Sequence, residues 1–265
     1  MTQSIYEDLP DPMTEACSRF FTEHWEVASF LFFVFTIAAE RDEQAERASS
    51  PIGAFQALKS RERLMLELTL CKEVNNFLAY LTELLTSVFI ARPEALRSSD
   101  KVRIDEVLQF STVDDIVSYL AERRVLELAY GNIADLAAHF EKVGLELFLE
   151  SEETKAATRI IQARNLLTHN RGVVNRFFLS KVPGHPCSLG DVLPLVMDQV
   201  FLDIDFLAHV VCRVESAAIR KFGLSAMVPR KIHDERMSGM GDLIDRITRS
   251  VLNQVANRTQ SGTSA

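Results

Sequence analysis

The chain has 265 residues, of which 47% are hydrophobic and 25% are charged, a composition that excludes a disordered or fibrous protein. This length is enough to bury a sizeable hydrophobic core without disulfides. The chain contains only 10 Gly and 8 Pro, so few residues break helices and long helices are expected. The formal net charge of −8 argues against a protein that coats itself with nucleic acid.

Helical periodicity dominates the first half of the chain. It predicts a helix from residue 14 to about 47, with Thr14 as its N-cap. A Ser-Ser-Pro-Ile-Gly turn at 49–53 separates this helix from a long one at about 54–91, which ends before Pro93. After a polar connection at 93–104, three shorter helical patterns cover Val113–Ala129, Asn132–Val143 and Leu145–Leu149, with Gly131 and Gly144 at helix-ending positions.

The second half of the chain is also mainly helical. The pattern predicts a helix from Glu152 to about Asn170, ended by Gly172. An irregular segment at 173–190, with a short extended run from Val173 to Leu179, comes next. Strong helical patterns then cover Asp191–Phe222, closed by Gly223, and an amphipathic segment, Asp242–Asn257, which a polar tail follows.

These patterns predict an all-α helical bundle. The sequence contains no glycine-rich phosphate-binding loop and no alternation of strands and helices that would build a parallel sheet. The longest apolar run, Val27–Ala39, has 13 residues, whereas a membrane span needs about 20. It therefore predicts a buried or partner-facing helix without membrane contact, and a membrane anchor is the alternative.

The cysteines and the N-terminus indicate a cytoplasmic protein. The N-terminal residues are polar and acidic and lack the basic start of a secretory signal. The four cysteines are widely spaced and have no histidine at zinc-ligand spacing, so reduced, mostly buried thiols and no metal site are expected; they are Cys17, Cys71, Cys187 and Cys212.

The charge is distributed unevenly along the chain. The 37 residues from Thr154 to Gly190 contain no Asp or Glu but hold six basic residues: Lys155, Arg159, Arg164, Arg171, Arg176 and Lys181. This window therefore carries +6, and the remainder of the chain carries −14 because the whole chain carries −8. A buried helix can lack acidic residues by chance, but the same window is also a candidate site for an anionic ligand.

Three polar residues lie near the end of the helix predicted at 152–170. Asn165 and His169 are four residues apart and therefore lie on one helix face. Arg164 lies about 140° around the helix axis from His169. Leu166 and Leu167 are expected to turn toward the core. This arrangement lets Asn165 hold the imidazole or a ligand, and it lets Arg164 reach an anion.

The motif resembles the signature of the HEPN superfamily of α-helical domains, which has an Arg, a polar residue, and a His after four to six intervening residues. Arg164, Asn165 and His169 match this pattern, and the sequence Asn-Arg-Gly-Val-Val at 170–174 is similar to the ending of many bacterial members. The likeness covers roughly residues 55–225. It implies a HEPN-type bundle at 51–235, between a Phe-rich helical extension at 1–50 and a C-terminal amphipathic helix with a tail at 236–265.

The resemblance implies a metal-independent ribonuclease without a cofactor, whose composite active site forms where two motifs meet across a homodimer. The expected roles are general acid or base for His169, phosphate binding for Arg164, and orientation of one of them by Asn165. Substrate contacts are expected from Asn170, Arg171 and Arg176. Bacterial HEPN proteins often serve as toxins or phage-defence effectors, so RNA and a separate antitoxin or regulatory protein are the expected partners.

Other functions fit the same sequence. A non-catalytic module of this fold would use Arg164 and His169 only to bind RNA, a nucleotide or a protein partner. A helical interaction protein would instead use the Phe-rich run at 27–39 and the C-terminal helix. In the plainest interpretation of the motif, Arg164 caps the end of its helix and His169 is a surface histidine.

The remaining candidate residues have weaker patterns. Asp205 and His209 have the i, i+4 spacing of a metal-binding pair, but together with Asp198 and Asp203 they are more typical of the polar face of an amphipathic helix. His24 and Trp25 are interpreted as packing residues. Three further histidines show no partner pattern: His139, His185 and His233.

Overall fold

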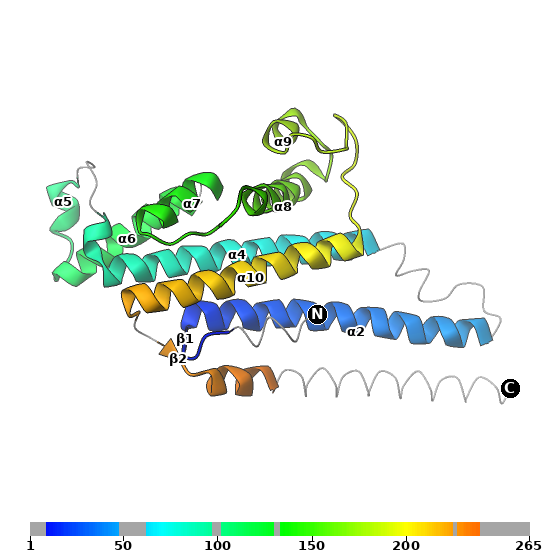
Figure 1. Cartoon of the computed structure of the whole chain (residues 1–265), viewed down its shortest axis with the longest axis horizontal. Helices are drawn as coiled ribbons and strands as arrows, with labels where there is room; N and C mark the ends of the chain where they lie inside the picture. The colour runs from blue at the N-terminus through cyan, green and yellow to red at the C-terminus, as the bar shows by residue number, and fades with distance from the viewer. Residues whose placement is uncertain (1–8, 48–61, 97–101, 130–132, 225–226, 239–265) are drawn as a thin grey trace.

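Three long helices lie side by side in the computed structural model and form its main body: α2 (Glu15–Arg47), α4 (Glu62–Ala91) and α10 (Met197–Phe222) (Figure 1). The structure describes residues 9–47, 62–96, 102–129, 133–224 and 227–238, with the side chains of 32–47 and 126–129 excepted. The all-α prediction is confirmed, because the described chain is mainly helical and its sheet has only two short strands.

Shorter helices connect α4 to α10. They are η1 (Pro93–Leu96), α5 (Ile104–Val107), α6 (Val113–Ala129), α7 (Ile133–Lys142), α8 (Ser151–Asn170) and α9 (Arg176–Lys181). In the view of Figure 1, α7, α8 and α9 lie on one side of α4 and α10, and α2 lies on the other side. The central helix α4 contacts α2, α6, α8 and α10.

The first residues of α2 are tied to the far end of the chain. Strand β1 (Met13–Thr14) pairs antiparallel with β2 (Met227–Val228). The hydroxyl of Thr14 accepts a hydrogen bond from the backbone N–H of Cys17 at 3.2 Å, so the predicted N-cap is confirmed. Residues 230–238, which follow β2, are helical.

One hydrophobic core joins the three long helices. Phe20 and Phe21 of α2 are buried in it with Phe77 and Tyr80 of α4 and with Val211 of α10. The described part of the Phe-rich N-terminal segment therefore packs inside the bundle, although not every apolar side chain there is covered. Within the apolar run at 27–39, Leu31 is buried, whereas 57% of Phe30 is exposed.

Helix α4 is long and apolar enough, by length and composition, to cross a membrane, and no other helix in the described ranges is. Half of its most apolar window is buried inside the protein. Its buried residues include Leu66, Leu81 and Phe89, which contact the common core. The helix therefore serves here as the central support of the bundle.

The structure corrects several predicted elements. Residues 145–149 are not helical, because Gly144 turns the chain at φ +74° and Leu145 and Leu147 are buried as an anchor. The extended run at 173–179 is instead mainly α9, since the side chain of Asn175 accepts a hydrogen bond from the N–H of Phe178 and so caps that helix. Helix α10 begins only at Met197, because the backbone of Leu193 bonds to Gly172 and to Arg63.

The remaining predicted features are partly changed, partly outside the described residues and partly confirmed. Helix η1 lies in the segment predicted as a polar connection at 93–104, and α5 begins at the last residue of that segment. The helix pattern at 242–257, Gly131 and the start of the long helix at 54–61 lie outside the described residues. All four cysteines are free thiols, as predicted, with Cys17 and Cys212 buried.

Candidate functional site

Helix α8 carries the predicted motif, and its packing fixes which side chains face outward. Ile160 and Leu166 are buried in the core, and Leu167 packs partly against it. Arg164 and Asn165 are half-buried, and His169 is exposed. The prediction that the two leucines turn inward is therefore confirmed, and the polar residues of the motif lie at the surface.

Arg164 is held between two side-chain amides. Its guanidinium donates one hydrogen bond to the Oδ1 atom of Asn165 at 2.9 Å and another to the Oδ1 atom of Asn75 on α4. Its Nε atom is buried and has no hydrogen-bond partner among the described residues. The Arg164 side chain therefore links α8 to α4. Some of its N–H groups, including that of Nε, are not used in these two hydrogen bonds.

A pocket of about 340 Å³ opens between the C-terminal half of α8 and the start of α9. Asn165, His169 and Asn170 from the motif contribute to its lining, together with Gln162, Asn175 and Phe177. Arg164 does not line the pocket and lies at its edge, where Asn165 links it to the lining. The structure thus brings together three of the six predicted site residues in one pocket.

The turn after α8 has an unusual backbone. Arg171 is the C-cap and adopts the left-handed conformation at φ +52°, which is uncommon for a residue other than glycine. Gly172 follows at φ +73°, and a Cβ atom there would lie 2.7 Å from the guanidinium of Arg63. The amide of Asn170 donates to the carbonyl of Val173, which closes the turn. The predicted glycine stop is confirmed, and the positive φ of Gly172 is the reason for glycine at this position.

Arg171 and Arg176 are exposed and do not line the pocket. Arg176 is the first residue of α9, so the two cations flank the loop that leads from α8 to α9. Of the six basic residues in the acid-free window, Lys155 and Arg159 form ion pairs with Glu152 and Asp203. The other four have no ion pair with any residue that the structure describes: Arg164, Arg171, Arg176 and Lys181.

The predicted polar face of α10 needs correction. Asp203 is buried, with 6% of its side chain exposed, and it binds both terminal nitrogens of Arg159. It therefore belongs to the contact between α8 and α10. The imidazole Nδ1 atom of His209 lies 3.9 Å from the carboxylate of Asp205, and no cluster of three or more potential metal ligands occurs among the described residues.

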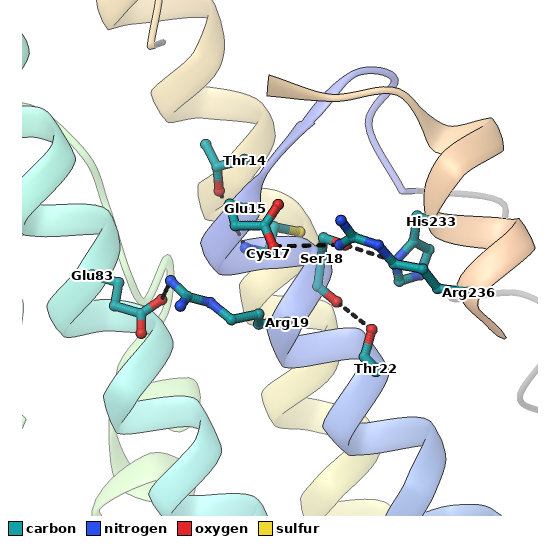
Figure 2. Close-up of polar contacts among 9 residues, drawn as sticks. All are labelled: Thr14, Glu15, Cys17, Ser18, Arg19, Thr22, Glu83, His233 and Arg236. Carbon is teal, nitrogen blue, oxygen red and sulfur yellow. Dashed lines mark hydrogen bonds and ion pairs between the residues drawn. The ribbon is translucent and has the colours of Figure 1, made fainter. Parts of the chain in front are cut away.

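A second polar cluster joins α2 to helical residues 230–238, as Figure 2 shows. The Ser18 hydroxyl lies 3.1 Å from the Nδ1 atom of His233, and Arg236 contacts Ser18 and Glu15. His233 is fully buried, and this burial lowers the pKa of its imidazole. Because Ser18 is also fully buried, the contact serves to hold the two helices together and leaves no access for a substrate.

A third cluster lies at the centre of the bundle. The Glu215 carboxylate accepts hydrogen bonds from the N–H of Thr14 at 2.6 Å and from the Tyr80 hydroxyl at 3.1 Å. Burial raises the pKa of Glu215, and burial together with the nearby Glu215 raises the pKa of Tyr80. His24, predicted to be a packing residue, is buried and its Nδ1 atom lies 3.1 Å from the Glu73 carboxylate.

Sequence reasoning missed several residues of the site. Asn75 contacts Arg164 from 89 positions away, and no local pattern marks it. Gln162 lies within the segment that carries the motif, but its spacing has no known meaning in the signature. Asn175 and Phe177 belong to a helix that the sequence did not predict. The periodicity of α9 is too short to detect.

The pocket and its surroundings provide an exposed imidazole, several amides and nearby cations, and no carboxylate lines it among the described residues. This lining suits an anionic or polar ligand. Comparisons of the chain with protein-family models, with curated proteins and with solved structures find no match. The resemblance carried by Arg164, Asn165 and His169 therefore stays a prediction.

Proposed function

We propose that this chain is a metal-independent endoribonuclease of the HEPN type. One juxtaposition supports the proposal best: His169 and Asn165 line the same pocket, and Asn165 is hydrogen-bonded to Arg164 at its edge. An exposed imidazole and an anchored guanidinium are two of the groups that cleavage of an RNA phosphodiester needs, one for proton transfer and one to stabilise the phosphate charge.

The proposed chemistry begins with attack of a ribose 2′-oxygen on the adjacent phosphorus. The P–O5′ bond then breaks, leaving a 2′,3′-cyclic phosphate and a 5′-hydroxyl. One group must accept the 2′-OH proton, and another must protonate the 5′-oxygen. His169 performs one of these transfers, and N–H groups of Arg164 stabilise the charge on the phosphorane. Since one imidazole cannot do both in the same step, the second comes from another copy in a homodimer.

The cations around the pocket would hold the RNA strand. Arg171 and Arg176 are exposed on either side of the loop between α8 and α9, and neither is neutralised by a described acidic residue. Asn170, which lines the pocket, directly precedes Arg171 in the chain. These residues are proposed to contact the phosphates that flank the scissile bond.

The proposed setting is a bacterial defence or toxin system in the cytoplasm. An RNA-cutting enzyme needs restraint until it is required, so a separate antitoxin or regulatory protein is the proposed second partner. The alternative is a non-catalytic module that only binds RNA or a nucleotide. The experiment described next distinguishes it from the ribonuclease.

The test uses the purified full chain, end-labelled single-stranded RNA and excess EDTA. Cleavage should persist and yield 2′,3′-cyclic phosphate ends, and His169→Ala should lower its rate about 100-fold or more. The matched control is His209→Ala, which removes an exposed histidine of α10 and should leave the rate unchanged. Cleavage that EDTA abolishes, or that survives in His169→Ala, would overturn the proposal. RNA binding without cleavage, lost in Arg164→Ala, would establish the non-catalytic alternative.

A further inference from the structure

The pocket beside His169 has a second property that the cleavage chemistry does not use: much of its polar lining consists of side-chain carboxamides. Gln162, Asn165, Asn170 and Asn175 all contribute to it. A carboxamide offers both an N–H donor and a C=O acceptor, which distinguishes it from the charged groups that bind phosphates.

Several of these amide groups have hydrogen-bonding capacity left for a ligand. Gln162 is only 8% exposed, and its amide makes no hydrogen bond with any described residue. Asn165 and Asn175 use their oxygens to accept bonds from Arg164 and from the Phe178 N–H, so their NH₂ groups remain. Asn170 uses its NH₂ group on Val173, which leaves its oxygen. An amide that has no protein partner and lines a pocket is free to form hydrogen bonds with a polar ligand there.

An aromatic side chain stands beside these amides. Phe177 lines the pocket, yet 61% of it is exposed to solvent. The ammonium group of Lys181 lies 5.7 Å from the centre of its ring. An exposed phenyl ring next to amide donors and acceptors is the combination with which proteins hold an unstacked nucleobase, stacking on its face and bonding to its edge.

The polar groups of the pocket lining favour adenine over guanine and cytosine. Among the described residues that line it there is no Arg or Lys, the usual partners of guanine O6 and N7, and no Asp or Glu, which accept from cytosine N4. A Gln or Asn side chain instead pairs bidentately with adenine. We infer that this pocket is a base subsite for an adenine of the RNA strand, with Gln162 bonded to the base edge and Phe177 stacked on its face. The inference rests on the proposed function for its substrate class.

The test measures binding to the full chain by isothermal titration calorimetry and needs no cleavage. The probes are AMP, GMP and ribose 5-phosphate, the last of which keeps the sugar and phosphate but lacks the base. AMP should bind at one site per chain, at least about ten-fold more tightly than GMP or ribose 5-phosphate. Gln162→Leu and Phe177→Ala should each weaken AMP binding about ten-fold.

Two controls make the result specific. Phe201→Ala removes an exposed aromatic ring of α10 that does not line the pocket, and it should leave AMP binding unchanged. Phe177 is largely exposed, so its replacement tests the base subsite even if Gln162→Leu fails to fold. Equal binding of AMP and ribose 5-phosphate, tighter binding of GMP, or AMP binding that Phe177→Ala does not change would overturn the inference.

This result is separable from the proposed function. RNA cleavage that depends on His169, without AMP binding at this pocket, would leave the ribonuclease and remove the adenine subsite. AMP binding that depends on Phe177, without cleavage in EDTA, would keep the subsite and remove the ribonuclease.

Discussion

The Arg164 guanidinium on α8 donates a hydrogen bond to the side chain of Asn75 on α4, a contact between residues 89 positions apart. This bond fixes the cation of the motif relative to the central helix of the bundle. Because the two groups are in direct contact, a charged side chain at position 75 would offset or reinforce the positive charge that Arg164 presents to a ligand.

Replacing Asn75 with Asp should therefore lower RNA cleavage. The new carboxylate would form an ion pair with Arg164 and offset the positive charge that the proposed mechanism directs at the phosphate. We expect a rate at least about ten-fold lower, because the substituted group competes directly with the phosphate for the guanidinium. The free energy of unfolding should change by less than about 1 kcal/mol, as is usual for a pair at the surface.

The control for this variant is Gln109→Glu, which changes the net charge by the same amount at an exposed position between α5 and α6. Cleavage kinetics on the two variants separate a local effect from a general weakening of RNA binding. If both lower the rate equally, Arg164 is not the group affected and the proposed role for it fails.

Replacing Asp203 with Ala should strongly destabilise the protein. Asp203 binds both terminal nitrogens of Arg159, at 2.9 and 2.5 Å, and also accepts from Gln199 at 2.7 Å. Its loss leaves a partly buried guanidinium without its counter-charge, so the free energy of unfolding should fall by about 2–3 kcal/mol. Urea denaturation measures this change. Asp205→Ala, on the same helix, should cost less than about 0.5 kcal/mol, and equal losses in the two variants would contradict the prediction.

Replacing Arg171 with Gly should raise stability and lower activity together. The left-handed backbone at φ +52° disfavours a residue with a Cβ atom, so glycine should add about 0.5–1 kcal/mol to the free energy of unfolding. Loss of the cation should weaken RNA binding at the same time.

The matched variant is Arg171→Ala, which removes the same charge but keeps the Cβ atom. It should bind RNA as weakly as Arg171→Gly without the gain in stability. Thermal unfolding and RNA titration at low salt measure the two effects separately. Equal stability of the Gly and Ala variants would show that the backbone there is not under strain.

Replacing Glu215 with Gln should change how stability depends on pH. Burial raises the pKa of this carboxyl from its ordinary value of 4.5, so the folded state holds its proton more tightly than the unfolded state. The contribution of Glu215 to stability is therefore complete below that ordinary value and is lost as the pH rises through the folded-state pKa.

The Gln variant keeps an uncharged group at the same place, so its stability relative to the natural protein should be greater at pH 8 than at pH 4. Urea denaturation across this range tests it. Glu235→Gln changes a carboxyl that is 66% exposed and should show no such trend. A difference that grows toward acid pH would reverse the sign and refute the argument.

The sequence alone was sufficient to predict that most segments of the bundle are helical, because each has enough apolar residues at helical spacing to identify its buried face. Helix α6 matches its predicted bounds, and α8 and α7 differ from theirs by a residue or two. The sequence misled where tertiary contacts outweighed local preference. Leu145 and Leu147 anchor a non-helical segment in the core, and contacts of Leu193 with Gly172 and Arg63 delay the start of α10.

For the candidate site too, some features could be predicted from the sequence and others depended on the tertiary structure. Spacing on α8 was sufficient to predict that Asn165 and His169 share a face and that Gly172 ends the helix, since both follow from helix geometry and backbone sterics. Only the tertiary structure decided that Arg164 is held by Asn75, that Asp203 is a buried ion-pair partner, and that α9 completes a pocket with Phe177. The physical reason is that a local pattern records which face of one helix is apolar, whereas partners of polar groups depend on which distant helix packs against it.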